Sequence, residues 1–202
     1  MLSLEERARR FATRAHGGLG QRRKYTEEPY IVHPAAVAEL VRSVSPDDEA
    51  LLAAAWLHDT VEDTATTPGD IAARFGEDVA QLVAMLTNPT TPATLNRAQR
   101  KRLHFAHTAQ ACPRAQTLKL ADIIDNTREI LRYDPDFARI YLLEKQIQLE
   151  VLTQGNSHLL QKAHGIITNG IAMLMQPPYN VPADWFVKKA AGYLGKAASK
   201  SV

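Results

Sequence analysis

Four ionisable side chains lie within six residues of an otherwise apolar stretch, where the sequence from Trp56 to Thr64 reads W-L-H-D-T-V-E-D-T. If this stretch is helical, spacings of three and four residues place these groups on one face: His58, Asp59, Glu62 and Asp63. Burying such groups without partners is costly. A bound cation would offset the carboxylate charge and accept the imidazole lone pair. The segment therefore predicts a metal-dependent enzyme.

Helical periodicity dominates the rest of the sequence, and no run of alternating polar and apolar residues indicates a strand. Ser3 with Glu6 forms a capping-box pattern, Pro34 can open a second helix, and Thr67 with Pro68 opens a short helix that Gly76 ends. After a proline-containing connector at residues 87–94, four longer helical patterns follow, over residues 95–111, 114–131, 137–154 and 157–175. We therefore expect an all-α helical bundle.

Length and composition are typical of one soluble domain with an appendage. The 202 residues are 45% hydrophobic and 23% charged, and neither a membrane-spanning apolar run nor a signal-peptide pattern is present. The single cysteine, Cys112, excludes an internal disulfide and indicates a reducing compartment, so we expect a cytoplasmic protein. We predict a main domain over residues 1–176 and, after Pro177 and Pro178, a helical extension over 177–202 that packs on it.

The charge distribution indicates a small anionic ligand. A net charge of +2 is too small to favour binding of nucleic acid across the surface, and we expect neither nucleic acid nor a membrane as a partner. Locally, Arg22, Arg23 and Lys24 form a basic run in a glycine-rich loop ahead of His33, where an anion could be received.

Two further segments extend the predicted metal site. His33 lies in P-Y-I-V-H-P at a helix entrance, and Asp122 lies in L-K-L-A-D-I-I-D-N within a predicted apolar helix. Two histidines and two aspartates from three helices make a four-ligand set: His33, His58, Asp59 and Asp122. Nitrogen and oxygen ligands without a thiolate favour a hard or borderline divalent ion, Mn²⁺ first, with open positions for water and substrate.

Five segments together resemble the HD-type hydrolase domain of the RelA/SpoT group, and most closely its small stand-alone alarmone hydrolases of the metazoan SpoT type. In order they are A-H-G-G-L-G-Q-R-R-K, P-Y-I-V-H-P, A-A-W-L-H-D-T-V-E-D-T, F-G-E-D-V-A-Q-L-V and L-K-L-A-D-I-I-D-N-T-R. They span about residues 8–152 in the order and spacing of that family.

The resemblance implies an all-α HD-domain phosphohydrolase that removes the 3′-diphosphate of (p)ppGpp-like alarmones and releases pyrophosphate. By motif position His33, His58, Asp59 and Asp122 would hold the metal, and Glu62 and Asp63 would act on water. The expected helix agrees, because both carboxylates lie one turn beyond the His-Asp pair, within reach of a bound water. Asp63 could instead lie outside the ligand set and accept a hydrogen bond that orients a metal ligand.

Substrate contacts also follow from the resemblance. Arg23 and Lys24 would face the purine and the phosphates, Asn126 the ribose, and Tyr141 would pack by the sugar or serve as a core tyrosine. Lys119, one turn before Asp122, would steady that carboxylate or neutralise phosphate. The sequence departs from the family pattern at Asp125, a carboxylate beside the expected nucleoside pocket, which leaves guanine and adenine alarmones, (p)ppGpp and (p)ppApp, both open.

Two other functions compete with this reading. An HD phosphohydrolase of another nucleotide, such as an NADPH 2′-phosphatase or a 5′-nucleotidase, would use the same metal site. A non-catalytic nucleotide sensor would be expected to lack a metal ligand or Glu62, and this sequence retains both. The aromatic residues of the extension, which include Trp185, Phe186 and Tyr193, could pack on the domain, join a homo-oligomer or touch a membrane surface.

Overall fold

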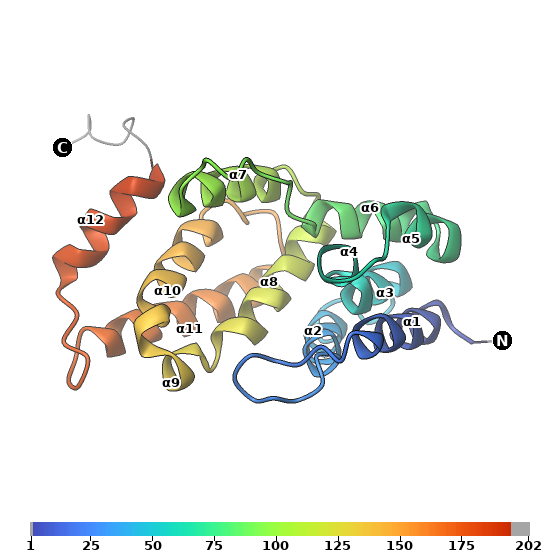
Figure 1. Cartoon of the computed structure of the whole chain (residues 1–202), viewed down its shortest axis with the longest axis horizontal. Coiled ribbons are helices and arrows are strands. Elements are labelled where there is room, and N and C mark those ends of the chain that lie inside the picture. The colour runs from blue at the N-terminus through green and yellow to red at the C-terminus, as the bar shows by residue number, and fades with distance from the viewer. Residues whose placement is uncertain (1, 195–202) are drawn as a thin grey trace.

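The computed structural model describes residues 2–194, and these residues form twelve helices (Figure 1). The helices are α1 (Leu4–Gly18), α2 (Val32–Arg42), α3 (Glu49–Leu57), α4 (Thr60–Asp63), α5 (Pro68–Phe75), α6 (Glu77–Leu86), α7 (Arg97–Ala109), α8 (Pro113–Thr127), α9 (Ile130–Tyr133), α10 (Pro135–Leu149), α11 (Ser157–Leu174) and α12 (Ala183–Leu194). Within this range, β pairing is limited to an isolated bridge between Arg22 and Pro29. None of these helices is both long and apolar enough to cross a membrane. The predicted all-α fold is confirmed.

Two helices, α3 and α8, form the centre of the fold. Every residue from Leu51 to Leu57 in α3 is buried, as expected for a helix that is apolar on all sides. This helix packs against α1, α2, α6 and α8, and α8 packs in turn against α2, α6 and α11. In Figure 1, α1–α5 gather to the right of α8, and α9–α12 lie to its left. His58 and Asp59 directly follow α3 and Asp122 lies on α8, so the core holds these candidate functional residues in place.

The local start and stop signals account for several helix boundaries. Thr67 and Asp70 form a reciprocal capping box at α5, and Gly76, with φ of 91°, ends it in a conformation that favours glycine. At α1 the capping box is only half formed. Ser3 accepts a hydrogen bond from the Glu6 N–H, but the Glu6 carboxylate binds Arg9 and Arg10 instead.

Three predicted boundaries were wrong, and one of them is the end of the helix predicted over residues 137–154, which lies at Leu149. The second helix begins at Val32, so Pro34 lies inside its first turn, where a missing N–H is tolerated. The helix predicted over residues 114–131 is divided into α8 and α9. Pro135 then begins α10, and the side chain of Asp134 caps that helix by accepting from the Phe137 N–H at 3.0 Å.

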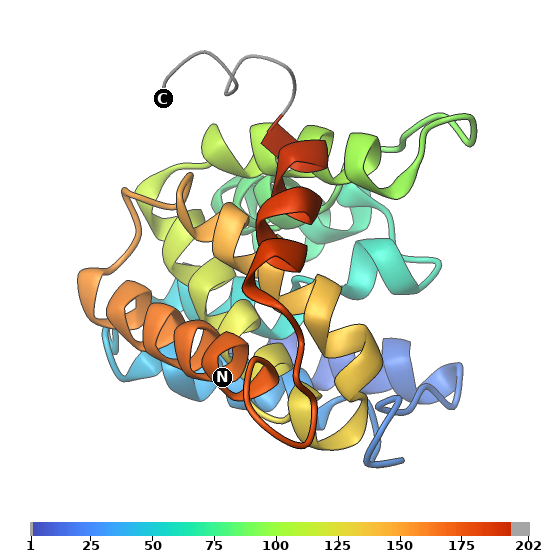
Figure 2. The same ribbon diagram turned by 90° about the vertical axis from the view of Figure 1, so that its left-hand side faces the viewer.

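The last described helix, α12, packs against α7 and α10 (Figure 2). Its Tyr193 hydroxyl donates to Glu144 Oε1 at 2.8 Å, and Arg97 contacts the same carboxylate with two N–H groups at 2.6 and 2.9 Å. Glu144 is only 1% exposed, so these donors compensate the burial of its charge. The domain boundary at residue 176 stays a prediction, and residues 195–202 of the predicted extension lie outside the described residues.

A close approach at Gly155 fixes the loop before α11 against α8. A Cβ atom at this position would lie 2.7 Å from Leu120 Cδ1 and 3.2 Å from the backbone carbon of Gln116. We therefore expect Gly155→Ala to lower the free energy of unfolding by about 1–3 kcal/mol, the usual cost of overpacking. Gly165 in α11 has open space at this position, so Gly165→Ala should instead raise stability by up to about 1 kcal/mol. Urea unfolding of both variants tests the contrast, and equal effects would contradict it.

Candidate active site

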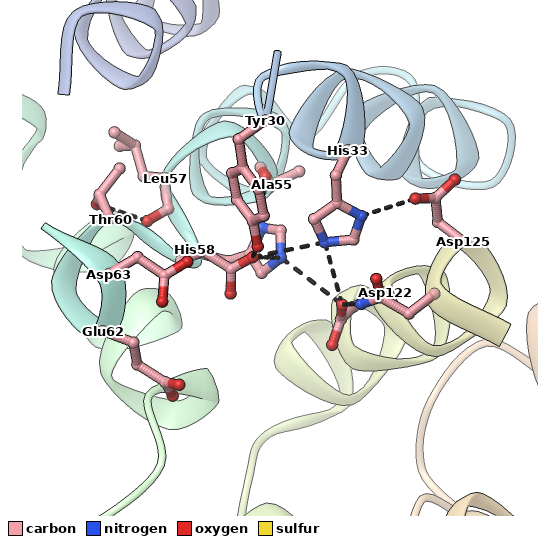
Figure 3. Close-up of polar contacts among 12 residues, drawn as sticks. Tyr30, His33, Ala55, Leu57, His58, Thr60, Glu62, Asp63, Asp122 and Asp125 are labelled. Carbon is pink, nitrogen blue, oxygen red and sulfur yellow. Dashed lines mark hydrogen bonds and ion pairs between the residues drawn. The ribbon is translucent and has the colours of Figure 1, made fainter. Parts of the chain in front are cut away.

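The helix expected around His58 and Asp59 is interrupted at these two residues. Leu57 ends α3 and Thr60 begins α4. His58 Nδ1 lies 2.8 Å from the Ala55 carbonyl oxygen, and Thr60 Oγ1 donates to the Leu57 carbonyl oxygen at 2.7 Å. These side chains occupy carbonyls that a continuing helix would use. The expectation of one shared helix face was therefore wrong, and α4 carries Glu62 and Asp63 as a separate turn (Figure 3).

Four side chains from three parts of the fold meet at one point: His33 of α2, His58 and Asp59 between α3 and α4, and Asp122 of α8. His33 Nε2 lies 3.5 Å from Asp59 Oδ2 and 3.3 Å from Asp122 Oδ1. His58 Nε2 lies 3.1 Å and 3.8 Å from the same two oxygens (Figure 3). The structure thus brings together all four residues that the sequence indicated as metal ligands.

In both histidines Nδ1 lies within hydrogen-bond distance of a protein oxygen, whereas Nε2 makes no hydrogen bond to a described residue. His33 Nδ1 lies 2.7 Å from Asp125 Oδ2, and His58 Nδ1 lies against the Ala55 carbonyl oxygen. In the described part of the chain, the Nε2 atoms of His33 and His58 are buried and make no hydrogen bond. An acceptor on Nδ1–H leaves the lone pair on Nε2, the form that ligates a metal. Two imidazole nitrogens and two carboxylates therefore fit a divalent cation.

The charged groups of the cluster shift one another's pKa values. Burial raises the pKa of Asp122, but the Lys119 ammonium and the two imidazoles outweigh it and hold that pKa well below its usual range. Burial likewise raises the pKa of Asp59, and His58 and His33 outweigh it. Burial lowers the pKa of His58, but Asp59 and Asp122 raise it to about 9. The cluster therefore holds its carboxylates ionised, and a cation that binds there would displace the Nε2 proton of His58.

Glu62 and Asp63, the predicted catalytic carboxylates, are exposed on α4 and each is held by a different loop. Glu62 Oε1 accepts a hydrogen bond from the Asn88 N–H, and the Asn88 amide lies 3.4 Å from Glu62 Oε2. Asp63 Oδ2 accepts from Gln21 Nε2 at 2.8 Å. Gln21 in turn contacts the buried His16 through its side-chain oxygen, 2.7 Å from His16 Nδ1. Both carboxylates thus have fixed neighbours outside the four-residue cluster.

A cavity of about 390 Å³ adjoins the cluster and reaches from the loop before α2 to α8 and α9. Its lining includes His33 and three predicted substrate contacts: Arg23, Lys24 and Asn126. Tyr25 and Tyr133, whose rings stack with centroids 5.7 Å apart, line it as well. Cationic and aromatic groups at one cavity suit a nucleotide, because phosphates pair with the charges and a base can stack on a ring.

Each of the predicted substrate residues Arg23, Lys24, Asn126 and Lys119 contacts a carboxylate. Arg23 Nη1 lies 2.5 Å from Asp125 Oδ2, so its guanidinium is held at the cavity wall. The Lys24 ammonium is exposed and lies 3.3 Å from Asp134 Oδ2. Asn126 Nδ2 donates to Asp122 Oδ1 at 2.6 Å, and the Lys119 ammonium donates to Asp122 Oδ2 at 2.8 Å. Lys119 therefore has the anionic partner that a lysine in an apolar helix needs.

Tyr141 lies apart from the other predicted contacts. Among the described residues that line the cavity, Tyr141 and Lys119 are not found. The Tyr141 ring packs against Phe137 with centroids 5.5 Å apart, and the Lys145 ammonium lies 5.2 Å from its centroid. Burial and the charge of Asp122 raise the pKa of Tyr141 above its usual value.

Sequence reasoning missed two partners of the cluster. The Tyr30 hydroxyl donates to Asp59 Oδ2 at 2.5 Å, and Asp125, which lines the cavity, also contacts His33 Nδ1. Tyr30 belongs to the P-Y-I-V-H-P segment, three residues before His33, which was the one available signal for it. Asp125 was noticed as a departure from the family pattern, but its partner could not be read from a separation of 92 residues.

The segment of the chain that contains the four-residue cluster is similar to known proteins. Residues 8–141 match the family described as HD domain. The chain belongs to the HD-domain family. Its curated relatives include the guanosine-3′,5′-bis(diphosphate) 3′-pyrophosphohydrolase MESH1 of Xenopus tropicalis, 42% identical over 57% of this chain and 64% of the relative. The human protein of the same name is 41% identical over 62% of this chain and 69% of the relative. The aligned segment thus spans about two thirds of these relatives.

A solved structure extends the similarity of this HD-domain chain beyond that segment. The structure titled "A metazoan ortholog of SpoT hydrolyzes ppGpp and plays a role in starvation responses" matches with a TM-score of 0.73 and 32% identity. The match covers 85% of this chain and 98% of that protein. The resemblance to RelA/SpoT-type HD hydrolases is therefore confirmed.

Proposed function

We propose that this protein is a metal-dependent phosphohydrolase that removes the 3′-diphosphate of (p)ppGpp-like alarmones, with guanine or adenine as the base. The observation that carries the proposal is the meeting of two carboxylates with two buried imidazole Nε2 atoms, which make no hydrogen bond in the described chain, at the edge of a cavity lined by Arg23 and Lys24. The relatives named for this reaction support it.

The proposed metal ligands are His33, His58, Asp59 and Asp122. Mn²⁺ is the ion that we propose, because hard carboxylates and imidazoles with no thiolate suit it. When bound, a divalent ion supplies charge neutralisation for phosphate and lowers the pKa of water. Tyr30, Asn126 and Lys119 hold the two carboxylates in place by donating to Asp59 and Asp122.

The reaction then follows from the remaining residues. Water forms a bond to the phosphorus attached to the 3′ oxygen, and the bond from phosphorus to that oxygen breaks. The 3′ oxygen is the leaving group and takes a proton from solvent water, which gives pyrophosphate and a nucleotide with a free 3′ hydroxyl. We assign to the Glu62 carboxylate the proton that the water loses, with the Asn88 N–H orienting it. Asp63 supports the same side of the site through Gln21. Arg23, Lys24 and Asn126 bind the nucleotide, and Tyr141 is proposed to pack near the sugar.

A substrate panel separates this function from its competitors. Purified protein with Mn²⁺ would be given ppGpp, pppGpp, their adenine counterparts, NADPH and nucleoside monophosphates, with each product identified by chromatography. We expect pyrophosphate from the 3′-diphosphate nucleotides. Orthophosphate from NADPH or a monophosphate alone would favour the other nucleotide phosphohydrolases, and binding without turnover would favour a nucleotide sensor. A cytoplasmic location and homo-oligomer formation stay predictions.

The basic loop should govern substrate affinity. We expect Arg23→Ala and Lys24→Ala to raise KM more than they lower kcat, because these side chains hold parts of the substrate that do not react. Lys24 is mostly exposed and held weakly, so its loss should affect binding alone. Steady-state pyrophosphate release from ppGpp measures both constants. Arg139→Ala, which removes a partly exposed α10 arginine paired with Asp136, serves as the control. Unchanged KM in both loop variants would refute the assignment.

A further inference from the structure

Asp125 is a buried carboxylate that contacts one imidazole and two guanidinium groups. Its Oδ2 atom lies 2.7 Å from His33 Nδ1 and 2.5 Å from Arg23 Nη1. Its Oδ1 atom lies 3.4 Å from Arg128 Nη2. With 7% of its surface exposed, the carboxylate depends on these partners for compensation of its charge. Both oxygens are therefore already engaged, which leaves little capacity for reading a purine edge.

The contact with His33 determines which ring nitrogen faces the cluster. An ionised carboxylate can only accept, so His33 Nδ1 must carry the proton that it donates to Asp125 Oδ2. The lone pair of the neutral ring is then on Nε2, which points toward Asp122 (Figure 3) and lies 3.5 Å from Asp59 Oδ2. His58 reaches the same state with the neutral Ala55 carbonyl oxygen as its acceptor. The two histidines thus differ in the charge of the group behind them.

The contact with Arg23 joins the same carboxylate to the substrate side of the site. Arg23 belongs to the loop that precedes α2, and it is about one fifth exposed at the cavity that Asp125 also lines. A single oxygen, Asp125 Oδ2, therefore lies between the imidazole of His33 and the guanidinium of Arg23. The loop is held a second time at Asp134, through Lys24 and Tyr25, but that contact does not include a histidine of the cluster.

We infer that Asp125 is a positioning residue that orients His33 for metal binding and, through the same oxygen, fixes Arg23 at the nucleotide cavity. The inference rests on the proposed function, because it takes His33 to be a metal ligand. It extends that function by assigning a role to the residue at which this sequence departs from its family's pattern. An acceptor behind a ligating histidine typically contributes 10–100-fold to metal affinity.

The experiment is a titration of the metal-free protein with Mn²⁺, followed by the electron paramagnetic resonance signal of the free ion. We expect Asp125→Asn, which keeps the shape and one acceptor oxygen, to weaken Mn²⁺ binding by about 10-fold. Asp125→Ala removes the acceptor and should weaken it towards 100-fold. Thermal unfolding of the metal-free variants checks that they fold, and if the alanine variant does not, the near-isosteric asparagine variant decides.

Two control variants separate the contacts of Asp125. Asp134→Asn makes the same charge change at the other anchor of the loop, and it should leave Mn²⁺ affinity within about twofold of the parent. Arg23→Gln removes one partner of Asp125 but leaves the one at His33, so it should raise KM for ppGpp with little change in Mn²⁺ affinity. Parental Mn²⁺ affinity in both Asp125 variants, or an equal loss in Asp134→Asn, would overturn the inference.

The same measurements keep this inference distinct from the proposed function. Mn²⁺ binding is measured without nucleotide, so a graded loss of affinity in a protein that cleaves no 3′-diphosphate would support the role of Asp125 and remove the alarmone assignment. If the parent cleaves ppGpp but its Asp125 variants bind Mn²⁺ with parental affinity, the alarmone assignment stands and the role of Asp125 is refuted.

Discussion

Replacing either His58 or Asp59 with alanine is expected to abolish both divalent-ion binding and hydrolysis. His58 is 2% exposed, and its Nε2 atom makes no hydrogen bond in the described chain and faces the carboxylates of the cluster, so its loss removes a nitrogen ligand from a buried site. Loss of Asp59 removes one of the two carboxylates that offset the charge of a cation at this point. With one of four ligands gone, the remaining groups hold an ion poorly.

Metal content by mass spectrometry and pyrophosphate release from ppGpp test this prediction together. His158→Ala is the matched control, because His158 is an exposed histidine in the first turn of α11, and it should keep both properties. One bound ion per chain and parental turnover in either His58→Ala or Asp59→Ala would show that the metal lies elsewhere.

The second large effect is expected at Glu62. Glu62→Gln keeps the size of the side chain and an oxygen that can accept from the Asn88 N–H, but it cannot take a proton from water. We therefore expect the variant to retain the metal, since Glu62 lies outside the four-residue cluster, while kcat falls by about 10²-fold or more. Single-turnover kinetics with ppGpp, beside a metal titration, measures the two properties separately.

Glu77→Gln provides the control for this substitution. Glu77 is an exposed glutamate at the start of α6, whose side chain contacts only Gln81 of its own helix among the hydrogen bonds of the described chain, and kcat should stay at the parental value. Asp63→Asn then separates the two carboxylates, because a residue that only accepts from Gln21 should affect kcat less than the general base. A Glu62→Gln enzyme within a few-fold of the parent would refute the assigned role.

Local signals in the sequence accounted for the helices better than for the interruptions between them. Thr67, Asp70 and Gly76 fix the two ends of α5 through contacts within a few residues, and such contacts can be read from the sequence. The break at His58 also depends on local bonds, but to backbone carbonyls that an unbroken helix would use. Because the periodicity of apolar residues continues through this break, the pattern alone predicts one helix.

The candidate site was predictable to the extent that its residues lie in separate motifs. His33, His58 and Asp122 each stand in an apolar setting where an unpaired charge would be costly, and this requirement indicated that they meet. The groups behind them could not be predicted in the same way. Asp125 reaches His33 and Arg23 across 92 and 102 residues, so their pairing depends on the packing of α2 against α8.

The most direct test of the whole account is the rate of pyrophosphate release from ppGpp as a function of Mn²⁺ bound per chain. Metal-free protein should release none, and the rate should rise in proportion to occupancy and level off at one ion per chain, with pyrophosphate and the nucleoside 5′-diphosphate as the only products. A rate that does not depend on bound metal, or a protein that leaves ppGpp intact while it dephosphorylates a 5′- or 2′-monophosphate, would contradict the account.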